Sequence, residues 1–195
     1  MPMIRETIVT TVNAEGRVHI APLGLIAEGE GWLIAPFRPS TTLDNLLAVP
    51  FAVANHTDDV RVFAGCLTGR HDWATAAADV VPVPRLAQAL AHMELAVTGF
   101  ADDPLRPRLS CRVVHRATHA PFEGFNRAKA AVIEAAILVS RLHLLPRDQI
   151  EREIAGLRIA VDKTAGPEER EAWGWLMAKI AAHDAAGQTV IGQTP

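Results

Sequence analysis

The chain has 195 residues, of which 49% are hydrophobic and 21% charged, and its formal net charge is -3. This composition supports a substantial buried core and excludes a chain that is disordered over most of its length. Acidic and basic residues are interspersed, so no basic stripe is present to bind nucleic acid. No apolar run is long enough to span a bilayer, and we expect neither a nucleic-acid nor a membrane partner.

The N-terminal half has the pattern of β-strands joined by turns. Six segments fit strands: 6–13, 17–27, 32–36, 51–55, 93–103 and 108–119. Tight turns containing glycine separate the first three, which predicts an antiparallel meander. The nearly continuous apolar run of the fourth predicts a strand that is buried on both faces. Residues 73–84 are expected to be loop and extended chain.

Helical periodicity appears twice in the first half and dominates the second. The segments that fit helices are 41–48, 57–67, 126–145, 147–164 and 166–187, with Thr57 or Asp58 as the cap of the second and Gly187 just after the last. Pro146 is expected to end the third helix. The predicted class is α+β: a mostly antiparallel β-domain at 1–122, a helical region at 123–188 and a tail at 189–195.

One arginine and three hydroxyl residues precede the first predicted helix, in the stretch PFRPSTTLDNLL. Arg38 carries a permanent charge, and Ser40, Thr41 and Thr42 lie where the helix begins. The N–H groups and the dipole of a helix N-terminus favour an anion such as phosphate. The spacing of Thr41 and Asp44 also fits a capping box. On local chemistry alone, capping is the commoner role, and a phosphate site stays open beside it.

Two further motifs carry candidate binding residues. In VANHTDD, Asn55 ends the fourth predicted strand, where its carboxamide can donate to and accept from a planar heterocycle, or simply begin a turn. In FNRAKAAVIEAAILVSR, Asn126 can cap a helix whose first turns hold Arg127 and Lys129. Bases at that end oppose the helix dipole, so we expect an anionic ligand or a partner subunit to favour them.

No metal site is predicted. The best candidate set is Cys111, His115 and His119, which are spaced four residues apart. In a strand, residues four apart are separated by about 13 Å, so three of them cannot bind one ion. The sequence also lacks Walker, G-x-G-x-x-G, G-x-S-x-G and H-E-x-x-H motifs.

The cysteines and the N-terminal segment bear on the cellular compartment. Cys66 and Cys111 lie far apart and form no C-x-x-C pair, which is typical of reduced, buried thiols. The first residues include Arg5 and Glu6 and lack the long apolar run of a signal peptide. We therefore expect a cytoplasmic protein.

Taken in order, ETIVTTVNAEGRVHIAPLG, APFRPSTTLDNLL, VANHTDD and FNRAKAAVIEAAILVSRL resemble the family called domain of unknown function 447. The resemblance covers roughly residues 4–185. That family belongs to the FMN-binding split-barrel superfamily, with the flavin reductases and pyridoxamine phosphate oxidases. The resemblance implies a six-stranded antiparallel split β-barrel that dimerises, holds FMN at the subunit interface and carries a C-terminal helical region.

The resemblance also implies which residues contact FMN. Arg38, Ser40, Thr41 and Thr42 correspond to the grip on the phosphate; Asn55, with the backbone around Pro22 to Gly24, would lie near the isoalloxazine; Asn126, Arg127 and Lys129 would reach the flavin from the same or the partner subunit. The family's usual T-Y pair reads Thr42-Leu43 here, and the chain has no tyrosine. Any contact made by that aromatic ring is therefore not carried over.

The expected function is that of an FMN-binding homodimer acting as a flavin-dependent oxidoreductase of unknown substrate, with NAD(P)H or another small redox molecule as the candidate partner. Two alternatives stay open: a non-catalytic flavin carrier or ligand sensor, and a barrel that has lost FMN and serves as a dimeric interaction domain. No catalytic residue is assigned, because His19 and His56 fit structural roles better than acid–base roles.

Overall fold

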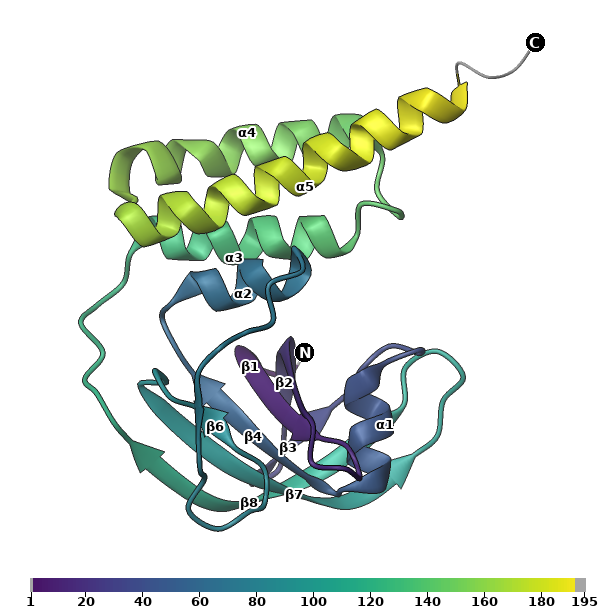
Figure 1. The fold of residues 1–195 in the computed structure, drawn as a ribbon, viewed down its shortest axis with the longest axis vertical. Helices are drawn as coiled ribbons and strands as arrows, with labels where there is room; N and C mark the ends of the chain where they lie inside the picture. Colours follow the sequence, from purple (N-terminus) through teal and green to yellow (C-terminus); the bar gives the residue numbers. More distant parts are fainter. Residues whose placement is uncertain (1, 192–195) are drawn as a thin grey trace. The chain divides into compact units, whose positions relative to one another are not determined.

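The computed structural model describes residues 2–191, with side chains to residue 185, and contains two compact units. Residues up to 58 and 72–122 form the barrel unit; residues 59–71 and those from 123 onward form the helical unit (Figure 1). Residues 59–71 therefore cluster with the C-terminal helices, whereas the sequence-based division placed them with the β-domain. Among the described residues, no helix is long and apolar enough to cross a membrane.

Six antiparallel strands of the barrel unit close into a barrel in the order β1-β2-β3-β8-β7-β4. They are β1 (Ile4–Val12), β2 (Val18–Glu28), β3 (Gly31–Ile34), β4 (Phe51–His56), β7 (Ala91–Ala101) and β8 (Arg108–Thr118). All six predicted strands are confirmed, each within two residues at either end. β4 pairs with β1 on one side and β7 on the other, so the sheet closes on itself.

The sequence explains why these strands close around one core. The middle of β4 is buried at four consecutive positions, as its continuous apolar run predicts. Aliphatic side chains from all parts of the barrel fill the interior, including Val9, Leu25, Ile34, Leu95 and Leu109. The helix α1 (Thr41–Ala48) adds Leu43 and Leu46 to the same cluster. The barrel and α1 therefore share one core.

Gly31 permits β3 to approach β8 closely. A Cβ atom at Gly31 would collide with the carbonyl oxygen of Cys111 on the neighbouring strand. Any side chain here would push the two strands apart. This requirement for glycine comes from strand packing, because Gly31 does not have a positive φ.

A buried carboxylate fixes the loop between the short strands β5 (Thr75–Ala76) and β6 (Arg85–Leu86). Glu94 on β7 is fully buried, and its carboxylate accepts hydrogen bonds of 2.6–2.8 Å from the N–H groups of Asp79, Val80 and Val81. Burial by itself raises the pKa of Glu94. The hydrogen bonds, that of Val81 foremost, outweigh it and hold the pKa below its ordinary value.

Four helices make up the helical unit: α2 (Val60–Leu67), α3 (Arg127–Ser140), α4 (Arg147–Thr164) and α5 (Pro167–Ile191). Small side chains on α3, such as Ala131 and Ala135, are buried against the apolar face of α4, where Ile150, Ile154 and Val161 recur at helical spacing. The helix predicted at 147–164 is confirmed with the same bounds.

Three predicted helix ends are wrong. α2 is capped by Asp59, whose Oδ1 accepts from the N–H of Arg61 at 3.0 Å, rather than by Thr57 or Asp58. α3 ends at Ser140, and Pro146 is the N-cap of α4 instead. α5 continues through Gly187, so the first part of the predicted tail at 189–195 is helical; residues 192–195 lie outside the described residues.

The close approach at Gly31 yields a stability prediction. We expect Gly31→Ala to lower the free energy of unfolding by about 1–3 kcal/mol, the usual cost of overpacking, because the colliding atom belongs to the backbone. The matched control is Gly156→Ala on α4, where a Cβ meets nothing within 4 Å. That change should add about 0.5–1 kcal/mol through helix propensity. Urea unfolding measures both, and equal stability of the two variants would contradict the packing account.

Candidate functional site

Arg38 lies between two loops of the barrel unit. Its Nη2 donates to Oδ1 of Asp102, in the β7–β8 loop, at 2.6 Å, and its backbone N–H donates to the carbonyl oxygen of Leu105 at 2.9 Å. The peptide bond between Arg38 and Pro39 is cis. The side chains of Arg38 and Asp102 are 38% and 67% exposed, so this ion pair faces solvent. The guanidinium is therefore within reach of a ligand.

A second arginine joins the same loops, and sequence reasoning did not single it out. Nε of Arg106 donates to the carbonyl oxygen of Ala35 at 2.9 Å, and its guanidinium lies 5.0 Å from the centre of the Phe37 ring. Asp103 braces the turn by accepting from the N–H groups of Arg106 and Leu105, and these bonds lower its pKa. The stretch DDPLRPR holds these charges, but its sequence does not reveal which loop they face.

The three hydroxyl residues occupy different environments at the start of α1. Ser40 is the N-cap, and its Oγ accepts from the N–H of Leu43 at 3.4 Å. The predicted capping box from Thr41 to Asp44 is therefore wrong by one residue, although capping itself is confirmed. Thr41 is exposed and Thr42 is buried. The first N–H groups of a helix have no intrahelical acceptor. An anion arriving at this end would meet Ser40 and Thr41 first.

Asn55 has a structural role inside the barrel. It is fully buried on β4, and its Nδ2 donates to the carbonyl oxygen of Ile8 on β1 at 2.9 Å. Its Oδ1 accepts from the N–H of Leu86 on β6 at 2.7 Å. The carboxamide thus bonds three strands to one another. The position of Asn55 near an isoalloxazine stays a prediction. Because its side chain is fully buried, it would act on such a ring by positioning the strands and not by direct contact.

Pro22 and Gly24 lie in the middle of β2, half-buried, opposite Ile8 and Glu6 of β1. A Cβ at Gly24 would lie 2.8 Å from Cγ2 of Ile4, a side-chain atom. Because Gly24 has no side chain, this stretch of β2 avoids a clash with Ile4. Pro22 and Gly24 therefore lie on β2, which pairs with β1, and β1 is the strand to which the Asn55 side chain donates its hydrogen bond.

Asn126, Arg127 and Lys129 belong to the helical unit. Asn126 is the N-cap of α3: its Oδ1 accepts from the N–H of Ala128 at 2.8 Å, while its Nδ2 donates to the carbonyl oxygen of Thr164 at 3.0 Å. Nζ of Lys129 lies 3.9 Å from Oε1 of Glu169, which is buried near the start of α5. A carboxylate thus offsets part of the unfavourable charge at the α3 N-terminus. Arg127 is exposed.

The candidate acid–base histidines stand at half-buried positions. His56 ends β4, and burial, followed by the charges of Arg5 and Arg116, lowers its pKa, so its imidazole is neutral at pH 7. His19 lies in β2 opposite Thr11. No catalytic role is assigned to either histidine, and the catalytic assignment stays open.

A surface cavity of about 310 Å³ lies elsewhere on the barrel unit, where β3, β7 and β8 adjoin. Its charged wall residues are Glu28, Glu30 and Arg112, and none of the predicted FMN contacts lines it. Cys111 is also in its wall, where burial and then the charge of Glu28 raise the pKa of the thiol to about 12. A thiol with so high a pKa is no nucleophile at neutral pH.

Family models cover most of the chain. Residues 5–120 match the model described as "Protein of unknown function (DUF447) N-terminal domain", and residues 126–178 match "Protein of unknown function (DUF447)". No curated protein matches this chain.

Solved structures share the fold at low sequence identity. The FMN-bound protein MM1853 from Methanosarcina mazei, of the same family model, aligns with a TM-score of 0.79 at 18% identity, covering 92% of this chain and 96% of that one. A putative flavin reductase with a split-barrel domain from Shewanella frigidimarina reaches 0.53 at 10% identity over 64% and 74%. Component B of nitrilotriacetate monooxygenase from Bacillus cereus reaches 0.51 at 20% over 67% and 77%. The fold is therefore a split barrel with added helices.

The environment of Cys111 predicts its reactivity. With a pKa raised from 9.0 to about 12, the folded state favours the neutral thiol, so this group's contribution to stability is present below about pH 9 and is lost as the pH rises towards 12. At pH 8 we expect iodoacetamide to alkylate Cys111 on the order of 10²–10³-fold more slowly in the native protein than in urea. Peptide mass spectrometry measures this rate, and equal rates in both states would disprove the assignment.

Proposed function

Because the chain belongs to the DUF447 family, we propose that it is a homodimeric FMN-binding protein and a flavin-dependent oxidoreductase. The fold likeness to the FMN-bound protein from Methanosarcina mazei supports this proposal. The observation that carries it is local: an accessible arginine, a capping serine and an exposed threonine stand together at the N-terminus of α1.

The chemistry of this segment suits the terminal phosphate of FMN. Arg38 offers a planar fork that binds phosphate oxygens bidentately, and the α1 N-terminus offers N–H groups and a favourable dipole. Thr41 contributes an exposed hydroxyl, whereas the buried Thr42 has only a backbone role in this arrangement. We assign the capping hydroxyl of Ser40 to both tasks, since it shapes the helix end that the phosphate meets.

The ion pair between Arg38 and Asp102 is weak enough for a phosphate group to displace Asp102 from Arg38. Both side chains are exposed, and pairs of this kind contribute about 0–1 kcal/mol. A phosphate dianion forms stronger, charge-assisted hydrogen bonds to the same guanidinium. We infer that Arg38 turns from Asp102 to the phosphate when FMN binds. Arg106, in contact with Ala35 and Phe37, is a second guanidinium in these loops, which also hold the carboxylates of Asp102 and Asp103.

The remaining predicted contacts take more modest roles in this proposal. Asn55 stabilises the strands near the proposed isoalloxazine site through its buried hydrogen bonds. Pro22 and Gly24 contribute a stretch of β2 in which Gly24 has no side chain to obstruct a ligand. Arg127 is the exposed cation of the α3 motif. Bound FMN supplies the redox chemistry. The chain binds and orients it, and we assign no side chain to proton transfer.

An exposed apolar surface next to Arg38 supports the homodimer. Phe37 and Leu105, which belong to the two loops that Arg38 joins, are 57% and 63% exposed. Large apolar side chains gathered beside a polar site are typical of protein interfaces. We propose that a second copy of this chain covers them, that NAD(P)H or another small redox molecule is the electron donor, and that the protein is cytoplasmic, as the wide sequence spacing of its two cysteines predicts.

A non-catalytic flavin carrier or sensor is the second candidate. One observation favours it: arginine, serine and threonine in the α1 segment bind phosphate but do not transfer protons at neutral pH. Both candidates predict a yellow protein, and a colourless one that fails to bind added FMN would refute both. Anaerobic bleaching of the bound flavin by NADH or NADPH would identify the enzyme; absence of bleaching with either would favour the carrier.

Replacing Arg38 tests the phosphate site. We expect Arg38→Ala to weaken FMN binding by about 1.5–3 kcal/mol, the usual value of a hydrogen bond to a charged group. The matched control is Arg17→Ala in the β1–β2 turn, which removes an exposed arginine paired with Glu15 and should leave affinity unchanged. Flavin fluorescence titration gives both constants. Wild-type affinity combined with lower thermal stability would show that the segment only caps α1.

Replacing Asp102 tests the exchange of partners. We expect Asp102→Asn to tighten FMN binding about two- to fivefold, because Arg38 loses a competing carboxylate that is worth at most about 1 kcal/mol. Asp162→Asn on the exposed side of α4 is the control for net charge. The same titration serves as readout, and weaker binding in Asp102→Asn would mean that Asp102 helps to hold the flavin instead.

A further inference from the structure

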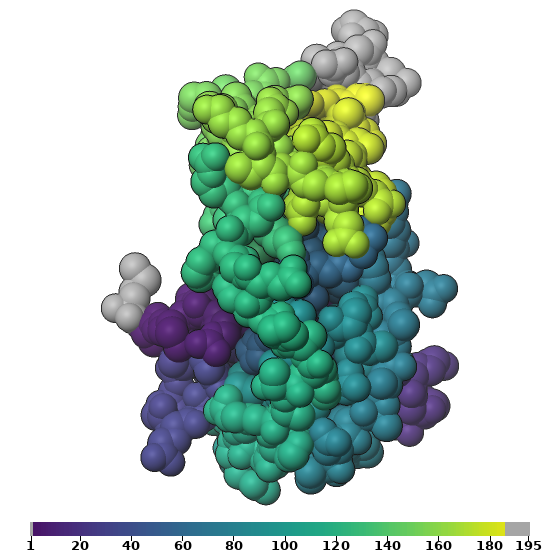
Figure 2. All heavy atoms as spheres, turned by 90° about the vertical axis from the view of Figure 1, so that its left-hand side faces the viewer, coloured from purple at the N-terminus to yellow at the C-terminus, as the bar shows by residue number. Residues whose placement is uncertain are grey.

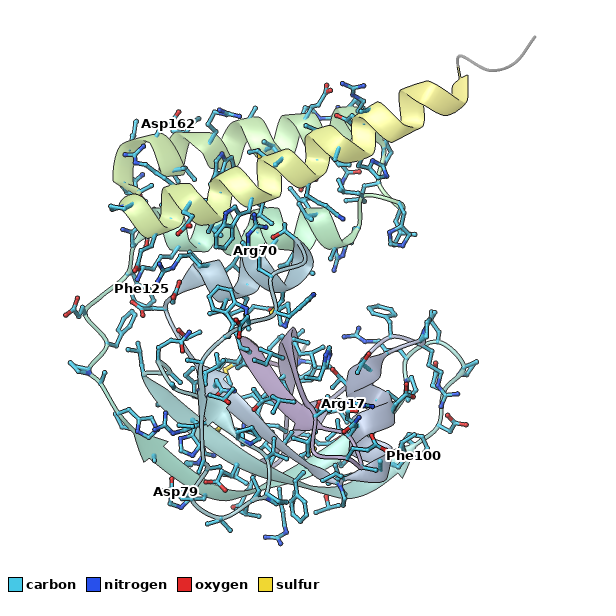
Figure 3. The ribbon with its side chains drawn as sticks, in the orientation of Figure 1. Arg17, Arg70, Asp79, Phe100, Phe125 and Asp162 are labelled. Atoms are coloured by element: carbon cyan, nitrogen blue, oxygen red, sulfur yellow. The ribbon has the colours of Figure 1, made fainter. Side chains whose placement is uncertain are left out.

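A second polar cluster of the barrel unit takes no part in the proposed FMN site. It consists of His92 and Glu94 on β7, His115 on β8, His119 just after the end of β8, and Asp79 in the β5–β6 loop. Figure 3 labels Asp79 on the loop that passes over these strands, and Figure 2 shows the blue surface of residues 72–90 adjoining the teal surface of β8. The cluster therefore combines three elements that are distant in sequence.

Three of these side chains converge with the spacing of metal ligands. One carboxylate oxygen each of Asp79 and Glu94 and one ring nitrogen of His115 all lie within 4.8 Å of one another. Nε2 of His115 is 3.2 Å from Oδ2 of Asp79. Ligands of a tetrahedral ion with bonds of about 2.0–2.1 Å are separated by about 3.3 Å. The distance between the His115 nitrogen and the Asp79 oxygen thus already matches that of two ligands bound to one ion.

The charges of Asp79 and Glu94 favour the binding of a cation between them. The carboxylates of Asp79 and Glu94 repel each other at this separation. Among the described residues, the side chains that contact them are the imidazoles of His92 and His115. The nearby guanidinium of Arg85 donates instead to the carbonyl oxygens of Leu86 and Ala87. Two acids accompanied by imidazoles form a donor set that suits a divalent ion.

Outer contacts hold the ligands in place, as in known metal sites. Glu94 is fixed by three backbone N–H groups and by Nε2 of His92, which lies 3.2 Å from its Oε1. His92 is fully buried, and its Nδ1 is 2.8 Å from Nε2 of His119, whose ring stacks on it. Asp79 and His115 are 55% and 35% exposed, so an ion can enter from solvent.

We propose that Asp79, Glu94 and His115 form a binding site for a divalent first-row transition-metal ion, with His92 as the residue that positions Glu94. One imidazole and two carboxylates match Zn²⁺ or Mn²⁺ better than Mg²⁺, which prefers water and oxygen ligands. The ion cross-links the β5–β6 loop to β7 and β8. The site involves no residue of the FMN proposal and stands independently of it.

Metal titration of untagged, chelator-treated protein tests the site. We expect Zn²⁺ to bind with one ion per chain in calorimetry and to raise the melting temperature, whereas Mg²⁺ at the same concentration does neither. His115→Ala and Asp79→Asn should each weaken Zn²⁺ binding at least about tenfold. Both residues are partly exposed, so these variants are expected to fold, which circular dichroism and a cooperative thermal unfolding transition would verify.

The control variant is His71→Ala, an exposed histidine of the helical unit, which should bind Zn²⁺ as the wild type does. Absence of a one-to-one Zn²⁺ complex in the wild type would overturn the proposal. So would a complex whose affinity is the same in His115→Ala, Asp79→Asn and His71→Ala, because the ion would then bind elsewhere.

Discussion

The pairing of β1 with β4 closes the barrel, and the buried side chain of Asn55 holds that pairing together. Only three residue pairs join these strands, from Ile8 with Asn55 to Thr10 with Val53. The Asn55 carboxamide adds a bond to the carbonyl oxygen of Ile8 and receives one from Leu86. A buried amide without partners would cost about 1–3 kcal/mol, so these two bonds favour the observed register of β1 and β4. The loops and α1 are positioned on the barrel that it closes.

The proposed phosphate site depends on two loops that hold each other. Arg38 reaches Asp102 and Leu105, while Arg106 reaches back to Ala35. These contacts fix the segment that leads into α1 and hold two arginines in the loops beside it, together with Asp102 and Asp103. Capping and anion binding are then compatible, because Ser40 satisfies one N–H group and leaves the end of the helix accessible.

Charged groups also explain how the helical unit is joined. Arg61 on α2 lies 2.8 Å from both Asp59, its own cap, and Glu168 on α5, and Arg70 stacks on Trp175 of α5. The hydrogen bond from Asn126 to Thr164 connects the start of α3 to the end of α4. Asn126, which the family resemblance predicts to reach the flavin, thus has a structural role within the helical unit, and its flavin contact stays a prediction.

The sequence by itself determined the strands and the interior of the helices, because burial imposes a period of two or 3.6 residues that can be read locally. Helix ends were less predictable: Thr57, Asp58 and Asp59 are all competent caps, and only the structure shows that Asp59 caps α2. The family motif also identified Arg38 as a candidate phosphate-binding residue. Only the tertiary structure decided its partner Asp102, 64 residues away, and the meeting of Asp79, Glu94 and His115. Such contacts depend on strand register and loop placement, and no local pattern in the chain records them.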